Sequence, residues 1–259
     1  MDLNKCNIEK LPQLHIPKDM RFTDKIFIHN NLLYKVFGDN SFTTEKNRNI
    51  DFLINNSVPN TPKIIEKLYK GNEFYGYIME YIPRALTFRQ AIKENVPTDC
   101  KIKAITDVYE AMKYLHSYNI YLGDIHSDNM LITSDKGYLI DLEEIRFPGD
   151  DFKFKQCYLV RANSLENRIN IPSVYTDNVK LMICSLSLLL EKDLEKYVDP
   201  KRYDINLEKL YNEVIVPLND EELLIYFADL MQERFTEYFP DYYFSHNKHK
   251  DRIIKKTML

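Results

Sequence analysis

Glycine is scarce in this sequence, with only six glycines among 259 residues. Neither Gly-x-x-x-x-Gly-Lys-Ser/Thr nor Gly-x-Gly-x-x-Gly occurs anywhere in the chain. These are the glycine-rich loops that bind phosphates in P-loop NTPases and in dinucleotide-binding dehydrogenases. The sequence therefore excludes a P-loop NTPase and a standard Rossmann dehydrogenase.

Paired cysteines, long apolar runs and an excess of one charge are also missing. The four cysteines are far apart and form no Cys-x-x-Cys pair, so neither a zinc site nor a disulfide framework is indicated. No stretch approaches the roughly 20 apolar residues of a membrane helix, and the first residues lack a signal-peptide pattern. The net charge is only −4, which gives no reason to expect nucleic acid or a membrane as a partner. We expect a cytoplasmic protein.

The first third of the chain has the pattern of a small β-rich unit with one helix. Short β-rich runs at 25–29, 32–37, 64–69 and 74–82 are separated by Asn, Gly and Pro, which are typical of turns. The region between the second and third runs has helical spacing of its apolar residues and ends before a proline. These features predict two strand pairs and one helix.

Beyond Pro83 the pattern becomes helical. Apolar residues recur at spacings of three and four over 102–115, which predicts a long amphipathic helix, and the apolar segment 179–190 predicts a helix buried on all sides. We therefore expect an α+β, bilobal protein with a small β-rich N-lobe at 1–82 and a larger helical C-lobe at 83–259.

The strongest chemical signal is Gly-Asp-Ile-His-Ser-Asp-Asn at 123–129, followed by Leu-Ile-Asp-Leu-Glu at 139–143. Taken alone, such residues are also common in plain turns. The two segments resemble the catalytic loop and metal-binding segment of the protein kinase-like superfamily, which includes bacterial aminoglycoside and choline kinases. The resemblance implies that Asp124 meets the acceptor hydroxyl, while Asn129 and Asp141 hold Mg²⁺ on the phosphates of ATP.

Two N-lobe residues extend this resemblance. Lys35 lies in a predicted strand, where the family places the lysine that contacts the α- and β-phosphates of ATP. Glu45 opens the predicted helix and resembles the family glutamate that pairs with this lysine. The alternative for Glu45 is a solvated glutamate in the first helical turn.

Two further segments match the family order. Met79, Glu80 and Ile82 resemble the hinge, which implies that Met79 is the gatekeeper and that the Glu80 carbonyl and the Ile82 amide bind adenine. Asp177 precedes the apolar helix, where a family aspartate supports the catalytic loop; the alternative is a helix N-cap. The order of these residues favours a kinase-like fold, with ATP and Mg²⁺ as cofactors.

The sequence also departs from the family pattern. No glycine-rich loop precedes Lys35. Lys18 or Arg21 could supply charge in its place, and the alternative is that both are exposed surface charges. Asp141-Leu142-Glu143 replaces the usual Asp-Phe-Gly, which argues against a mobile switch at this segment. Leu-Gly replaces the His-Arg before the catalytic aspartate, so we expect constitutive activity or control by a partner.

The acceptor is left open by the sequence. His126 is typical of small-molecule kinases, whereas the short distance of 43 positions from Tyr81 to Asp124 favours an open cleft for a protein substrate. We expect a serine/threonine-protein kinase. The alternatives are a small-molecule kinase of the aminoglycoside or choline type, and a pseudokinase scaffold without transfer activity.

Overall fold

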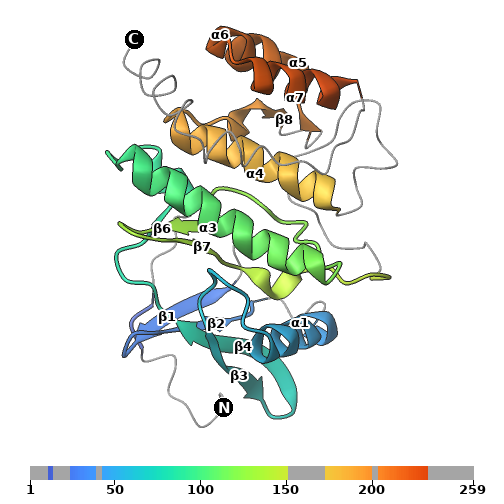
Figure 1. Cartoon of the computed structure of the whole chain (residues 1–259). Helices are drawn as coiled ribbons and strands as arrows, with labels where there is room; N and C mark the ends of the chain where they lie inside the picture. The colour runs from blue at the N-terminus through green and yellow to red at the C-terminus, as the bar shows by residue number, and fades with distance from the viewer. Residues whose placement is uncertain (1–10, 14–23, 39–42, 151–172, 200–203, 233–259) are drawn as a thin grey trace.

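A computed structural model describes residues 11–13, 24–38, 43–150, 173–199 and 204–232 (Figure 1). Lys18 and Arg21, the suggested substitutes for the missing glycine-rich loop, lie outside these residues.

The N-terminal part is a four-stranded antiparallel sheet in the order β1-β2-β4-β3. Its strands are β1 (Lys25–His29), β2 (Leu32–Val36), β3 (Ile64–Lys70) and β4 (Glu73–Glu80). Asn30 and Asn31 form the β1–β2 turn with φ angles of 50° and 59°, which asparagine tolerates better than most residues. Both predicted strand pairs are confirmed.

Helix α1 (Thr43–Asn55) packs on this sheet, mainly against β3 and β4 (Figure 1). Its fully buried Ile50 joins Phe37, Phe74, Tyr77 and Met79 in a small core. Strand β2 passes very close to β4, because a Cβ atom added at Gly76 would lie only 2.0 Å from the Lys35 carbonyl oxygen. A glycine is therefore required beside Lys35.

The C-terminal part begins with a three-stranded sheet in the order β5-β6-β7, which joins β5 (Leu86–Thr87) to β6 (Met130–Ile132) and β7 (Gly137–Leu139). Short helix α2 (Phe88–Ala91) follows β5, and the long helix α3 (Thr98–Ser117) packs against β7 and α4 (Val174–Leu189). The remaining elements are η3 (Leu142–Glu144), η4 (Glu195–Tyr197), β8 (Val198–Asp199), β9 (Asp204–Ile205), α5 (Leu207–Leu210), η5 (Tyr211–Ile215), α6 (Val216–Leu218) and α7 (Glu221–Met231).

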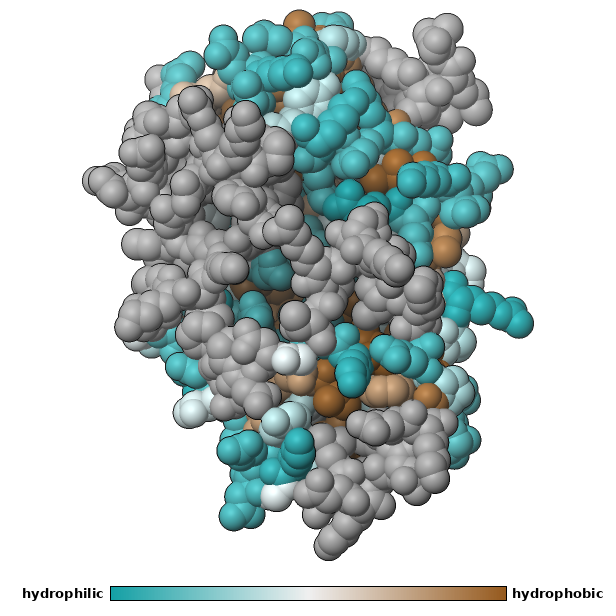
Figure 2. Space-filling view, turned by 180° about the vertical axis from the view of Figure 1, so that it is seen from behind, coloured by the Kyte–Doolittle hydropathy of each residue, from teal (hydrophilic) through white to brown (hydrophobic). Residues whose placement is uncertain are grey.

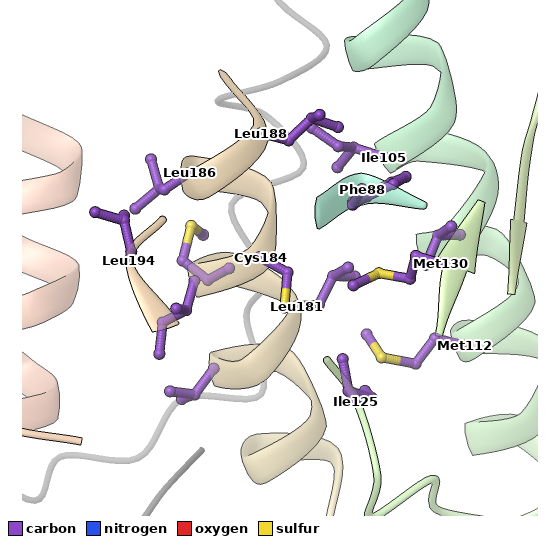
Figure 3. Close-up of a cluster of buried hydrophobic side chains, with 14 of the residues drawn as sticks. Phe88, Ile105, Met112, Ile125, Met130, Leu181, Cys184, Leu186, Leu188 and Leu194 are labelled. Atoms are coloured by element: carbon purple, nitrogen blue, oxygen red, sulfur yellow. The ribbon is translucent and has the colours of Figure 1, made fainter. Parts of the chain in front are cut away.

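The main core surrounds α4, in which every residue from Thr176 to Leu189 is buried. Figure 3 shows Leu181 and Cys184 of this helix facing Met130 of β6, and Leu188 beside Ile105 of α3. The expectation of a helix buried on all sides is confirmed.

The protein is thus a mixed α+β structure with a small antiparallel sheet and several helices, an arrangement compatible with two lobes. Seen from behind, hydrophobic residues gather in the lower half of the view, where the N-terminal part lies, and most other described surface is hydrophilic (Figure 2). Among the described residues, no helix has both the length and the apolar character needed to cross a bilayer.

Candidate functional site

Two residues of helix α4 bind the backbone of the loop that contains Asp124. The fully buried carboxylate of Asp177 accepts hydrogen bonds from the Leu122 amide at 2.9 Å and from the Gly123 amide at 3.2 Å. Lys180 donates to the carbonyl oxygen of Gly123. The N-cap of α4 is Ser173, so the alternative of Asp177 as an N-cap is wrong and the expected loop support is confirmed.

Asp124 and Asn129 lie together at the ends of this loop. The side-chain nitrogen of Asn129, Nδ2, donates to the backbone carbonyl oxygen of Asp124 at 3.0 Å and lies 3.4 Å from the Asp124 carboxylate. Asn129 is only 3% exposed, whereas the Asp124 side chain is 36% exposed. Asp124 is therefore the accessible carboxylate, and Asn129 is the fixed polar group beneath it.

His126 lies between two carboxylates of the same loop. Its Nε2 atom is 3.7 Å from Asp124, and its Nδ1 atom is 3.7 Å from Asp128. Burial lowers the pKa of His126, but the neighbouring carboxylates of Asp124 and Asp128 outweigh it and raise the pKa to about 10. The Asp128 amide also lies 3.3 Å from Nδ1, a contact that favours the neutral ring; two flanking carboxylates outweigh this single amide. His126 is thus a cation beside Asp124 at neutral pH.

Asp141 follows the end of β7 and lies near Asn129. The Ile140 amide donates to the Asn129 carbonyl oxygen at 3.0 Å, which brings Asp141 beside Asn129. Asp141 has φ 59° and ψ 47°, a left-handed conformation that costs on the order of 1–3 kcal/mol for a residue other than glycine. Such strain persists only where the surrounding contacts fix the backbone, and it is concentrated at functional sites.

Lys35 connects the sheet to this segment. Its ammonium lies 3.1 Å from Asp141 Oδ1 and 3.6 Å from Asp24 Oδ2, and it donates to Glu143. Burial lowers the pKa of Lys35, but the carboxylates of Asp141 and Glu143 raise it well above its ordinary value. Lys35 is only 3% exposed and stays charged because its partners are acidic.

Glu143, and not Glu45, is the glutamate partner of Lys35 among the described residues. Glu45 lies half-buried in the first turn of α1, outside the ion pairs of Lys35. Glu143 lies between α1 and β2, because its carbonyl oxygen accepts from Asn49 of α1 at 2.9 Å while its carboxylate binds Lys35 and the Tyr77 hydroxyl. The prediction that Glu45 pairs with Lys35 is therefore wrong, because the segment that contains Glu143 lies between α1 and Lys35.

Three more residue pairs join α1 to the segment that follows Asp141. Asn49 also donates to the Ile145 carbonyl oxygen at 2.8 Å, and Arg48 makes paired hydrogen bonds of 2.7 Å to Asp150. Lys46 lies 3.3 Å from Glu144. Helix α1 is therefore fastened to the chain that contains Glu143.

The expected hinge residues lie at the end of β4. Met79 is buried in the small core, Glu80 is the exposed last residue of the strand, and Ile82 follows it half-buried. The intervening Tyr81 amide donates to the Asn31 carbonyl oxygen at 3.0 Å, which fixes this segment to the β1–β2 turn. The adenine contacts of Glu80 and Ile82 stay a prediction.

A cavity of about 330 Å³ lies behind this strand, between the end of α1, strands β3 and β4, and the end of β7. Leu53, Met79, Leu139 and Leu142 supply apolar walls, and Asp141 also lines the cavity. The cavity thus adjoins both the expected gatekeeper and the expected metal ligand.

The donor groups fit a magnesium ion held largely by phosphates. No group of three or more His, Cys, Asp or Glu side chains is placed to hold a metal within the part of the chain that the structure describes. Asn129 and Asp141 instead offer one amide and one carboxylate oxygen, and Mg²⁺ is often bound by one or two protein ligands together with substrate phosphates. Both residues are consistent with that role.

No protein-family model matches the chain, and no curated protein matches it either. Lys35 nevertheless pairs with Asp141, and Asp124 lies beside Asn129, whereas Glu45 does not pair with Lys35. The functional roles of these residues stay predictions. Glu143 was missed as a partner of Lys35. The signal for it was an acidic residue at the position where the family has glycine.

Proposed function

We propose that the chain is a kinase with a protein kinase-like fold, which transfers the γ-phosphate of ATP to a hydroxyl group. The observation that carries this proposal is the convergence of one buried ammonium, Lys35, and one accessible carboxylate, Asp124, on the oxygen donors Asn129 and Asp141. Phosphoryl transfer depends mainly on such placement of charge. Bound Mg²⁺ would neutralise charge on the phosphates.

In this reaction Asp124 accepts the proton of the acceptor hydroxyl. The hydroxyl oxygen forms the new bond to the γ-phosphorus, the bond from that phosphorus to the β,γ-bridging oxygen breaks, and ADP leaves. Lys35 binds phosphate oxygens from the sheet side, and cationic His126 places a second positive charge near the reacting group.

A serine or threonine hydroxyl of a protein is the acceptor that the structure favours. Only β5 and the four-residue helix α2 lie between the end of β4 and the start of α3. This segment carries no larger insertion of the kind that helps to build the acceptor pocket in aminoglycoside kinases, and its short length supports a polypeptide acceptor. A small alcohol is the second candidate, favoured by His126.

The test is incubation of the full chain with γ-labelled ATP, Mg²⁺ and a panel of proteins and small alcohols. We expect label on protein serine or threonine, and none with Asp124→Asn, because an amide cannot accept the proton. ATP affinity should be retained in this variant. ATP binding without transfer to any acceptor by the wild type would favour a pseudokinase scaffold instead, and transfer by Asp124→Asn at the wild-type rate would contradict the assigned role.

A further inference from the structure

Two charged residues outside the kinase-like motifs meet at the loop 124–129. Arg89 comes from α2 and Glu195 from η4, and their side chains form an ion pair. Phe88 directly precedes Arg89, and Leu194 directly precedes Glu195. Both Phe88 and Leu194 are fully buried, and Figure 3 shows them in the core around α4. The ion pair is therefore held at both ends by the main core.

The Glu195 side chain and the Arg89 backbone bind one residue of the loop, Ser127. Glu195 Oε1 accepts from the Ser127 amide at 2.8 Å, and the Arg89 amide donates to the Ser127 carbonyl oxygen at 3.3 Å. Arg89 Nε donates to Asp128 Oδ2 at 2.7 Å. The backbone of Ser127 and the side chain of Asp128 are thus fixed from both sides.

Acidic groups surround the Arg89 guanidinium and keep it charged. Burial lowers the pKa of Arg89, but Glu195 and Asp128 raise it above its ordinary value. Asp193 Oδ2 lies 3.5 Å from the same guanidinium, and the Cys184 thiol donates to Glu195 at 3.5 Å. The planar guanidinium binds carboxylates on two sides at once, which a lysine ammonium does less well.

Ser127 lies between the two functional residues of the loop, Asp124 and Asn129. Asp128 directly precedes Asn129, and its carboxylate flanks the His126 ring, whose other side faces Asp124. The Asn129 amide donates to the His126 carbonyl oxygen at 2.9 Å, which closes a tight turn across Ser127 and Asp128. A shift at Ser127 would therefore displace both Asp124 and Asn129.

We infer that Arg89 and Glu195 are positioning residues for phosphoryl transfer, which bridge α2 and η4 across the loop and set the orientation of Asp124 and Asn129. This inference rests on the proposed function. A misplacement of about 1 Å in a reacting group can cost on the order of 100-fold in rate. Neither residue is assigned a contact with substrate.

The experiment measures kcat, KM and ATP affinity for the full chain with Arg89→Met, Arg89→Lys, Glu195→Gln and Glu195→Ala. We expect Arg89→Met and Glu195→Ala to lower kcat about 10- to 100-fold while ATP affinity changes less than about twofold. Arg89→Lys should lower kcat less than Arg89→Met does, because the lysine retains the positive charge. Glu195→Gln should lose less than Glu195→Ala, because the amide oxygen still accepts from Ser127. Lys93→Met and Glu94→Gln, at exposed positions just after α2, are the matched controls.

Thermal unfolding and amide hydrogen exchange separate positioning from stability. Faster exchange of the Ser127 amide in Glu195→Ala, with β6 and β7 unchanged, supports the bridge. An unchanged kcat, or a loss that only follows the folded fraction, overturns it as a positioning device. If the wild type transfers no phosphate, the proposed function fails; exchange at Ser127 then decides alone whether the bridge fixes the loop.

Discussion

Replacing Glu143 by alanine removes the one carboxylate that Lys35 and Tyr77 share. The side chains of Lys35 and Glu143 are each 4% exposed, and Tyr77 is 2% exposed. Removal of one member of a buried ion pair costs about 3–5 kcal/mol, because the other charge is left buried. Lys35 keeps Asp141 at 3.1 Å, so the lower end of that range applies. The Tyr77 hydroxyl loses its acceptor at 3.0 Å, which adds about 1 kcal/mol.

Glu143→Ala should therefore lower the free energy of unfolding by about 4 kcal/mol. Glu143→Gln retains an acceptor and similar volume and should lose about half as much. Urea unfolding measures both losses, provided that the slope of free energy against urea concentration is unchanged. Glu144→Ala is the control: its side chain is 31% exposed, so water partly screens its bridge to the 9%-exposed Lys46, and its loss should cost only about 1–2 kcal/mol. A loss in Glu143→Ala no larger than in Glu144→Ala would refute the reasoning.

The same pair gives a pH dependence with a defined sign. Burial raises the pKa of Glu143, but Lys35 outweighs burial and the pKa lies below its ordinary value of 4.5. A carboxylate with a depressed folded-state pKa stabilises the fold above its unfolded-state pKa and loses that effect as pH falls through the folded-state value. The stability gap between wild type and Glu143→Gln should thus be constant from pH 5 to pH 8 and should narrow below about pH 4.5.

Two other buried contacts give further predictions. Asp177→Asn should lower the free energy of unfolding by about 2–3 kcal/mol, because a fully buried carboxylate that accepts from three donors becomes an amide. The backbone amide hydrogens of Leu122 and Gly123 should then exchange faster with solvent. Asn49→Ala should lower the free energy of unfolding in urea by about 1–3 kcal/mol, since two carbonyl oxygens lose their donor. Arg48→Ala removes an exposed ion pair and should lower it by about 1 kcal/mol or less. Equal losses for these last two variants would contradict the buried role of Asn49.

The elements of the fold were predictable because their signals are local. The Asn30-Asn31 turn needs positive φ angles, and the apolar spacing of α3 needs only one buried face. The proximity of Asp141 to the loop 123–129 was predictable for a similar reason, since only the short strand pair β6–β7 separates them along the chain.

Contacts between distant segments were not predictable in this way. Glu143 is 108 positions from Lys35, and Arg89 is 106 positions from Glu195. Whether a charged residue meets a partner so far away depends on how the core places both backbones. The left-handed Asp141 and the docking of Asn49 on 143–145 decide this for Glu143, and no residue pattern near Lys35 indicates them.

The change of partner from Glu45 to Glu143 leads to a last prediction about turnover. If α1 supplied the glutamate, Lys35 would be oriented only when that helix lies close to β2. Here the glutamate belongs to the segment that begins with Asp141, so Lys35 and Asp141 are positioned by one piece of chain. Glu45→Ala should consequently leave kcat within about twofold, whereas Glu143→Ala should reduce it by 10-fold or more, because a preoriented group is lost.

A double-mutant cycle with Lys35→Ala separates the two glutamates. The loss for Lys35→Ala with Glu143→Ala should hardly exceed that for Lys35→Ala alone, because residues that act as a unit are not additive. The pair Lys35→Ala and Glu45→Ala should show no coupling. Coupling with Glu45, and none with Glu143, would mean that Lys35 changes its partner when nucleotide binds. Helix α1 would then have to release Asn49 from Glu143 and Ile145, a movement that amide exchange at Ile145 would detect.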